Sequence, residues 1–277
     1  LWPHDMSWRR HISTKRFYTR SIKLYTISKI IITRKLMKIK SLSELKTKVD
    51  QYLGVLGIDS SNIVGETIKL ALVGATSVGK SSTINALIGL NLCPIGHIGN
   101  TTKEAAWVPF TLTPNSNQPD IELLDLPGWG ISKSVDKTYK QILKENLPVA
   151  DAVLWVMKAD ALGNLAYDLD WIKNIILPSI NNDESKIILG LNQVQKVYDY
   201  QTINGELSSI QKEVVNEKCW LIHDQIKKEA INFDINNIQP YSSSEGYRLL
   251  SLLSSLIKAS GNKGWILQLI SNLELAK

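Results

Sequence analysis

The chain has 277 residues, of which 44% are hydrophobic and 21% are charged, a composition that predicts an ordinary globular protein with one large domain or two small ones. No apolar run is long enough to span a bilayer, and two cysteines far apart in sequence, Cys93 and Cys219, exclude a disulfide framework. Such cysteine usage fits a reducing compartment, so we expect a cytoplasmic protein.

The net charge of +6 is concentrated in one segment. Residues 1–36 contain nine Lys and Arg residues against a single acid, Asp5, so residues 37–277 carry a net charge of −2. Because the basicity belongs to this leader, the high isoelectric point of the chain is no argument for nucleic-acid binding by the remainder.

The leader itself allows four interpretations: upstream translated or cloning-derived sequence, a transit peptide, an arm that binds phosphate or membranes, and a solvated tail. Met37 opens a well-patterned helical segment and favours the first. We therefore expect residues 1–36 to be disordered or not native, and residues 37–65 to form a helix followed by a linker.

A phosphate-binding loop is the strongest signal in the sequence. Residues 67–73 are typical of a buried strand, and residues 81–87 of the first turns of a helix. The segment that joins them fits the pattern G-x-x-x-x-G-K-[ST]. It consists of Gly74, Ala75, Thr76, Ser77, Val78, Gly79, Lys80 and Ser81, and Ser82 follows in the helix.

Each position of such a loop has a physical reason. The glycines allow a tight turn in which successive backbone N–H groups point at phosphate oxygens, and the following helix adds the positive end of its dipole. Lys80 supplies a positive charge to the outer phosphates. Ser81 offers a hydroxyl to Mg²⁺, which prefers oxygen ligands.

The rest of the pattern alternates strands and helices. We expect strands at 103–112, 120–126, 152–157, 186–191 and 238–241, and helices at 133–146, 164–177, 205–233, 248–257 and 265–275. The short connection between the first two strands predicts an antiparallel pair at one edge. The fold class is therefore α/β, a three-layer arrangement with a mostly parallel sheet, one antiparallel edge strand and helices on both faces, over residues 66–260, with residues 261–277 as a C-terminal helix.

Four further polar motifs each lie beside a predicted strand. Asp125-Leu-Pro-Gly128 matches D-x-x-G of GTP-binding proteins. The other three resemble the switch-I, N-K-x-D and S-A-K-x-G motifs; they are Thr101-Thr102-Lys103-Glu104, Asn192-Gln193-Val194-Gln195 and Ser242-Ser243-Ser244-Glu245-Gly246. Since ligands of open α/β sheets bind at the carboxyl ends of the strands, we expect these motifs to form one site.

On these motifs the chain resembles the Era/TrmE-like branch of the translation-factor-related P-loop GTPases, in particular bacterial stand-alone G domains with an N-Q-x-D motif. The resemblance implies that the backbone from Ala75 to Lys80, with Gly128, holds the β- and γ-phosphates of GTP or GDP. It implies Mg²⁺ bound by Ser81 and Thr102, with Asp125 acting through water. The expected catalytic residues are Lys80, Thr102 and Gly128.

The resemblance also implies which residues would contact the guanine base. Asn192 and the stem of Gln193 would frame the guanine, the backbone N–H of Ser243 would meet its O6, and Gln195 and Ser242 complete the set. Since Gln195 replaces an aspartate that accepts two N–H bonds from guanine, and a carboxamide has one acceptor oxygen, we expect weakened guanine selectivity.

Two other departures affect catalysis. Trp129 follows Gly128, where Ras-like proteins have a water-orienting glutamine, and an indole has no acceptor. Hydrolysis would then need another group or a partner. Ser77 stands where potassium-activated relatives have asparagine, so we do not expect potassium dependence.

The leading hypothesis is a Mg²⁺-dependent GTPase switch that hydrolyses GTP slowly unless a partner assists. The alternatives are a nucleotide-binding scaffold that does not hydrolyse, and a dynamin-like membrane-associated GTPase. The last needs long helical stalks, and only about thirty residues follow the final motif, so we do not expect membrane association. An activating protein and ribosomal RNA are suggested as partners by family analogy alone, and a nucleotide-dependent dimer stays open.

Some side chains have ordinary structural interpretations. We expect His97 to be a surface residue, Asp168 and Asp170 to lie on a solvated helix face, and Trp107, Trp155 and Trp220 to pack. Trp129 is the aromatic residue that we expect to be functional, because it lies in a switch segment.

Overall fold

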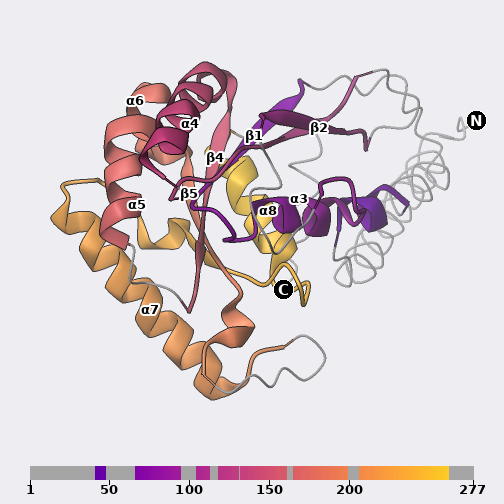
Figure 1. Ribbon diagram of the computed structural model, residues 1–277. Coiled ribbons are helices and arrows are strands. Elements are labelled where there is room, and N and C mark those ends of the chain that lie inside the picture. Colours follow the sequence, from indigo (N-terminus) through magenta and orange to yellow (C-terminus); the bar gives the residue numbers. More distant parts are fainter. Residues whose placement is uncertain are drawn as a thin grey trace, which may run out of the picture. The chain divides into compact units, whose positions relative to one another are not determined.

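The structure, a computed structural model, describes residues 41–47, 66–94, 104–112, 118–130, 132–160, 165–198 and 206–261 (Figure 1). All of them lie in one compact unit, Ile39–Ser271. The expectations for residues 1–36, for most of the segment 37–65, for His97, for Thr101–Lys103 and for the helix at 265–275 lie outside the described residues.

Six strands form the central sheet in the order β2-β3-β1-β4-β5-β6. They are β1 (Ile68–Val73), β2 (Ala106–Phe110), β3 (Ile121–Asp125), β4 (Ala152–Lys158), β5 (Ile187–Asn192) and β6 (Ile238–Pro240). Strand β2 is antiparallel to β3 and the other neighbours are parallel, which confirms the predicted edge pair. Both edges are short, and each contains a proline, Pro109 in β2 and Pro240 in β6.

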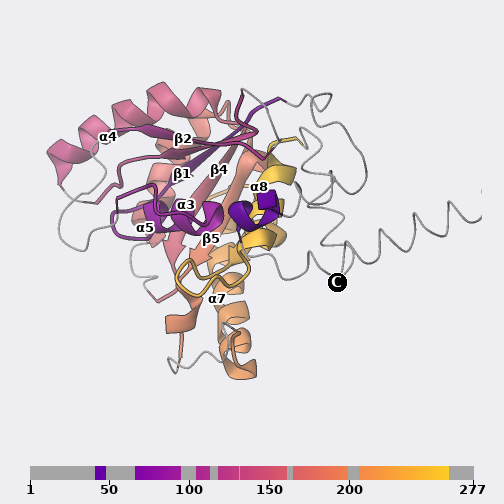
Figure 2. The ribbon, with the colours of Figure 1, turned by 90° about the vertical axis from the view of Figure 1, so that its right-hand side faces the viewer.

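Helices cover both faces of the sheet, as predicted (Figure 1). On one face lie α3 (Lys80–Ile88) and α8 (Leu249–Ala259), which Figure 2 places in front of the strands. The other face carries α4 (Lys133–Asn146), α5 (Leu165–Trp171), α6 (Leu177–Ser179) and α7 (Ser209–Lys228). Short helical turns complete the described part of the chain; they are η2 (Leu147–Val149), η4 (Ile172–Ile176, a π-helical turn), η5 (Glu184–Lys186), η6 (Val194–Lys196) and η7 (Ile235–Asn237).

The central strands explain why the apolar runs in the sequence are unbroken. All six residues of β5 are buried, as are the first six of β4, because helices cover both sides. Gly190 leaves room for a neighbour on the α8 face, since an added Cβ would lie 2.8 Å from both Leu154 and the ring of Tyr241. Tyr241 is fully buried there, and its hydroxyl lies 2.8 Å from that of Thr83 in α3.

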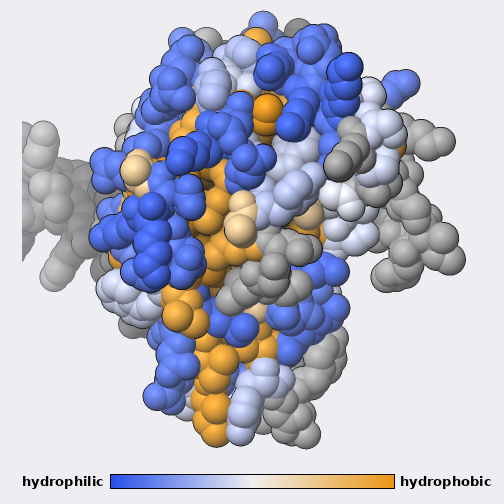
Figure 3. Space-filling view, turned by 60° about the vertical axis from the view of Figure 1, so that its left-hand side comes forward, coloured by the Kyte–Doolittle hydropathy of each residue, from blue (hydrophilic) through white to orange (hydrophobic). Residues whose placement is uncertain are grey.

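Two expectations on the helices need correction. The helix predicted at 205–233 is shorter, because a capping box between Ser208 and Gln211 starts α7 at Ser209 and the helix ends at Lys228. Trp220 does not pack into the core but is 62% exposed on α7, where Ile210 and Leu221 are also exposed. Figure 3 shows an apolar band that continues over this part of the molecule.

Candidate functional site

The loop between β1 and α3 has the backbone that its glycines predict. Gly74 and Gly79 have φ values of +148° and +101°, and Ser77 also has a positive φ of 63°. A side chain at Gly79 would lie 2.5 Å from the amide nitrogen of Asn192, and one at Gly74 would meet the carbonyl oxygen of Val156. Only glycine therefore fits at these two positions.

Lys80 is folded into this loop. Its ammonium donates to the carbonyl oxygens of Gly74 and Ala75, at 3.1 Å each, and the residue is only 7% exposed. Burial lowers the pKa of Lys80 to about 8, although the negative charges of Asp125 and Asp168 act in the opposite direction. The amine is still mostly protonated at neutral pH, so the loop holds a buried cation that suits an incoming anion.

Two of the three predicted metal ligands lie together. The hydroxyl of Ser81 donates to a carboxylate oxygen of Asp125 at 2.8 Å, and Asp125 is 3% exposed. Thr102 lies outside the described residues. Hydroxyl and carboxylate oxygens are the donors that Mg²⁺ prefers, so the pair fits this ion. Within the described part of the chain no cluster of three or more His, Cys, Asp or Glu side chains could hold a metal alone. The remaining ligands would come from phosphate and water.

Gly128 lies against the loop, as its predicted role requires. An added Cβ at Gly128 would be 2.6 Å from the Lys80 ammonium and from the amide nitrogen of Thr76. The hydroxyl of Thr76 donates to the Gly128 carbonyl at 3.0 Å, and its amide donates to the Trp129 carbonyl at 2.9 Å. The structure therefore brings Lys80 and Gly128, two of the predicted catalytic residues, into direct contact.

The side chain of Trp129 is in the core rather than in an open switch. It is 1% exposed, stacks on Trp171 with ring centroids 4.9 Å apart, and its Nε1–H donates to Oδ1 of Asp168 at 2.6 Å. The expectation that Asp168 is solvated is therefore wrong, although Asp170 is exposed. Burial raises the pKa of Asp168 to about 6, against the opposing effects of the Trp129 hydrogen bond and the Lys80 charge.

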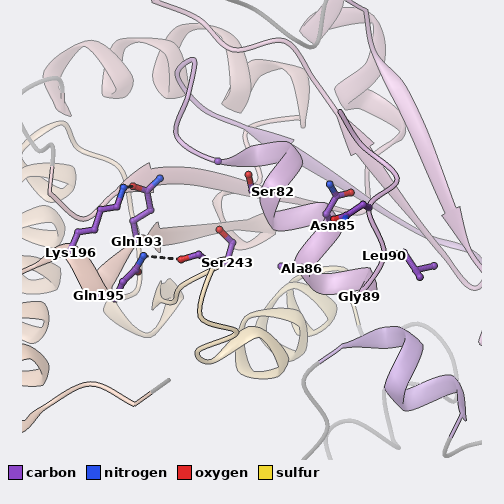
Figure 4. Close-up of a pocket in the computed structure, with 12 residues that line it drawn as sticks. Ser82, Asn85, Ala86, Gly89, Leu90, Gln193, Gln195, Lys196 and Ser243 are labelled. Atoms are coloured by element: carbon purple, nitrogen blue, oxygen red, sulfur yellow. Dashed lines mark hydrogen bonds between the residues drawn. The ribbon is translucent and has the colours of Figure 1, made fainter. Parts of the chain in front are cut away.

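A cavity of about 470 Å³ opens between α3 and the loops after β5 and β6. Figure 4 shows Gln193, Gln195 and Lys196 on one side and Ser82 and Asn85 of α3 on the other. The side chain of Asn192, which is fully buried, connects the phosphate loop with the loops after β5 and β6. Its amide donates to the Val78 carbonyl at 3.1 Å, and its oxygen accepts from the amides of Gln193 at 2.8 Å and Ser243 at 3.1 Å. Three of the predicted base residues, Gln193, Gln195 and Ser243, thus line one cavity beside the phosphate loop, whereas Asn192 and Ser242 do not line it.

Two polar groups here are arranged differently from the simplest expectation. The Ser243 N–H, predicted to meet O6 of guanine, donates to Asn192 in this structure. The amide of Gln195 donates to the Ser244 hydroxyl at 2.9 Å, and its Oε1 is buried without a hydrogen-bond partner among the described residues. A buried acceptor of this kind costs about 1–3 kcal/mol, so an N–H donor entering the site would satisfy it.

Sequence reasoning missed Asp168, Ser244 and the Thr76 contacts. The D-x-x-G motif located Gly128, but nothing in sequence spacing pairs Trp129 with Asp168, which is 39 positions away. A buried indole N–H requires an acceptor, so the presence of a partner was predictable while its identity was not.

The strand order, the loop and the motifs at the carboxyl ends of the strands define a P-loop G domain, the nucleotide-binding domain of GTPases. Comparison with known proteins supports this class. Residues 69–193 match a family model described as "50S ribosome-binding GTPase".

Two relatives and one solved structure illustrate the similarity. The chain is 31% identical to Escherichia coli YkfA over 155 residues, which cover 56% of this chain and 51% of YkfA. It is 33% identical to the probable GTP-binding protein EngB of Acidobacterium capsulatum over 82 residues, 28% of this chain and 39% of EngB. The fold is similar to that of Era in complex with MgGDPNP and 16S ribosomal RNA, with a TM-score of 0.54 and 24% identity over 71% of this chain and 57% of Era.

Residues 69–193 are therefore similar to a P-loop GTPase domain, and the chain spans about half the length of the first curated relative. Of the described helices, none is long and apolar enough to cross a membrane.

Proposed function

We propose that the chain binds GTP and hydrolyses it to GDP and phosphate in a Mg²⁺-dependent reaction. One observation carries this proposal: the Lys80 ammonium, the Ser81–Asp125 pair and Gly128 converge on a single loop whose glycine backbone suits phosphate. This is the arrangement that holds the outer phosphates of a nucleoside triphosphate.

The roles of the residues follow from their chemistry. Lys80 would neutralise the charge that develops on the outer phosphates, and the amides of the loop would orient them. Ser81 and Asp125, with Thr102, would hold a Mg²⁺ ion, which supplies further charge neutralisation when bound. Gly128 would offer its N–H to the γ-phosphate. Since an indole has no hydrogen-bond acceptor, the side chain of Trp129 cannot orient the attacking water as a glutamine would, and slow turnover follows.

The experiment is a single-turnover phosphate-release assay with and without Mg²⁺. Lys80→Ala should abolish release, whereas Lys228→Ala, which removes an exposed lysine of α7, should leave it unchanged. Hydrolysis that survives the loss of Lys80 would remove the proposal.

Guanine selectivity is a second part of the proposal. Because Gln195 offers one carboxamide acceptor where an aspartate offers two, we propose that GTP is preferred over ATP and XTP less strongly than in proteins with aspartate at this position. Gln195→Asp should increase the preference for GTP in competition binding. Strongly GTP-selective micromolar binding that this substitution does not alter would contradict the proposal.

A scaffold that binds nucleotide without hydrolysing it is the second candidate, and the burial of Trp129 favours it. Tight GTP binding without phosphate release, even with cell lysate added, would support it. A cytoplasmic location, a nucleotide-dependent dimer and a ribosomal partner are further proposals. The last rests on the names of similar proteins, among them Era bound to 16S ribosomal RNA.

A further inference from the structure

The last residue of the D-x-x-G motif and the two residues after it are hydrogen-bonded to other parts of the domain. The Gly128 carbonyl accepts from the Thr76 hydroxyl, and the Trp129 carbonyl accepts from the Thr76 amide. The Gly130 amide donates to Oδ1 of Asp136 in α4 at 3.0 Å. Asp136 is itself held, because its other oxygen accepts from the Tyr167 hydroxyl of α5 at 2.7 Å. The backbone of this segment is thus fixed at both ends.

The side chain of Trp129 adds an anchor in the core. Its ring lies nearly parallel to that of Trp171, with an interplanar angle of 12°, and its N–H donates to Asp168, which is 5% exposed. The indole and its acceptor come from distant parts of the sequence and are both shielded from water. A hydrogen bond to a carboxylate in such surroundings is among the stronger ones in proteins.

This anchor places Gly128 where an outer phosphate would have to enter. A single added methyl group at Gly128 would lie 2.6 Å from the Lys80 ammonium and 2.7 Å from Cα of Thr76. The Thr76 amide, which belongs to the phosphate loop, donates to the Trp129 carbonyl. A γ-phosphate that contacts both Lys80 and the Gly128 amide therefore needs the segment 128–130 to withdraw.

We propose that Trp129 and Asp168 are positioning residues that hold this segment closed, so that the domain admits a nucleoside diphosphate directly and a triphosphate only after the segment is displaced. This inference rests on the proposed nucleotide site. It adds that the segment 128–130 controls whether a nucleoside diphosphate or a triphosphate can bind there. A ligand that binds only the open form loses affinity in proportion to the fraction of closed molecules. Weakening the anchor should therefore improve triphosphate binding and leave diphosphate binding unchanged.

The test measures the affinities of the full chain for MgGDP and for a non-hydrolysable GTP analogue with Mg²⁺. Trp129→Phe keeps an aromatic ring and removes the N–H donor. The ratio of analogue to GDP affinity should rise by about tenfold, the effect expected for one hydrogen bond to a charged group. Asp170→Asn is the matched control, because it changes an exposed carboxylate of the same helix that contacts Asn174, and its ratio should equal that of the unaltered chain.

A purely structural role would weaken both nucleotides equally, and this result would overturn the inference. Failure of the unaltered chain to bind either nucleotide would instead remove the proposed function itself.

A second measurement does not depend on the stability of the variant. The indole N–H resonance of Trp129 in the unaltered chain, assigned by its loss in Trp129→Phe or by selective labelling, reports the bond to Asp168. It should move when the triphosphate analogue is added and stay in place with GDP. Saturation with the analogue that leaves this resonance unmoved would contradict displacement of the anchor.

Discussion

At the scale of single residues, glycine is required in the phosphate loop at positions where a Cβ atom would collide with a neighbouring group. Gly79 has both a left-handed φ and a close neighbour, the amide of Asn192, whereas Gly130 has a φ of +90° with nothing within 4 Å of an added Cβ. A side chain at Gly130 would therefore introduce backbone strain alone, whereas a side chain at Gly79 would introduce both backbone strain and a steric clash.

The matched pair Gly79→Ala and Gly130→Ala tests this difference. Gly130→Ala should cost about 1 kcal/mol of unfolding free energy through backbone strain alone, while Gly79→Ala should cost more and abolish nucleotide binding. Urea unfolding and nucleotide titration measure both effects. Equal costs for the two substitutions would show that Asn192 does not restrict the loop.

The buried carboxylate of Asp168 predicts a pH dependence. Its pKa in the folded chain is raised to about 6 by burial, above the ordinary aspartate value of 3.8, so the folded state binds this proton more tightly than the unfolded state. The stabilisation is complete below the unfolded pKa and is lost as the pH rises through about 6.

Asp168→Asn, which resembles the protonated form, should therefore gain stability relative to the unaltered chain between about pH 4 and pH 7. The expected gain is on the order of 1–3 kcal/mol. Denaturant unfolding of both proteins at several pH values measures it. A stability difference that is independent of pH would contradict the assignment of this pKa to Asp168.

At the scale of elements, α7 shows how one local signal sets a boundary. Ser208 accepts from the Gln211 amide, and the Gln211 side chain accepts from the Ser208 amide. Ser208→Ala should cost about 1 kcal/mol, while Ser209→Ala, one position inside the helix and exposed, should change stability by less than about 0.5 kcal/mol. Thermal unfolding of the two variants compares them, and similar losses would argue against the cap.

The strands and helices were predictable because burial on both faces leaves unbroken apolar runs, as in β4 and β5, and because helices show their apolar period. Contacts between distant elements were not. The exposure of Trp220 depends on the direction of one face of α7, and the burial of Asp168 depends on how α5 packs against Trp129. Neither is encoded in local spacing, so both expectations were wrong.

In the candidate site, too, the residues in sequence motifs were predictable and the contacts between distant loops were not. The phosphate loop, Asp125, Gly128 and Asn192 follow from motifs that lie at strand ends, and the structure places them together. The contact between Ser244 and Gln195 arises only when the loops after β5 and β6 meet. Roles for Thr102 stay predictions, because this residue lies outside the described part of the chain.

At the scale of the whole molecule, the site joins both halves of the sheet. The loop after β1 contacts Gly128 from the β3 side and Asn192 from the β5 side, so a bound nucleotide should stabilise the domain as one unit. At a concentration of about 100 times its dissociation constant, MgGDP should add about 2.7 kcal/mol of stability.

This stabilisation should appear as an increase of several degrees in Tm, in a single transition. Differential scanning calorimetry measures it, and Lys80→Ala should show little increase. Two separate transitions, of which only one responds to MgGDP, would contradict a shared site.

The two margins of the sheet restrict how copies of this domain could associate. A strand added from another molecule would pair with the backbone N–H and C=O groups of an edge strand. Pro109 in β2 and Pro240 in β6 each lack a backbone N–H, and β6 is only three residues long. Intermolecular β-augmentation and fibre growth are therefore disfavoured. Self-association of the domain should proceed through helices or loops, with no sheet continuous across subunits.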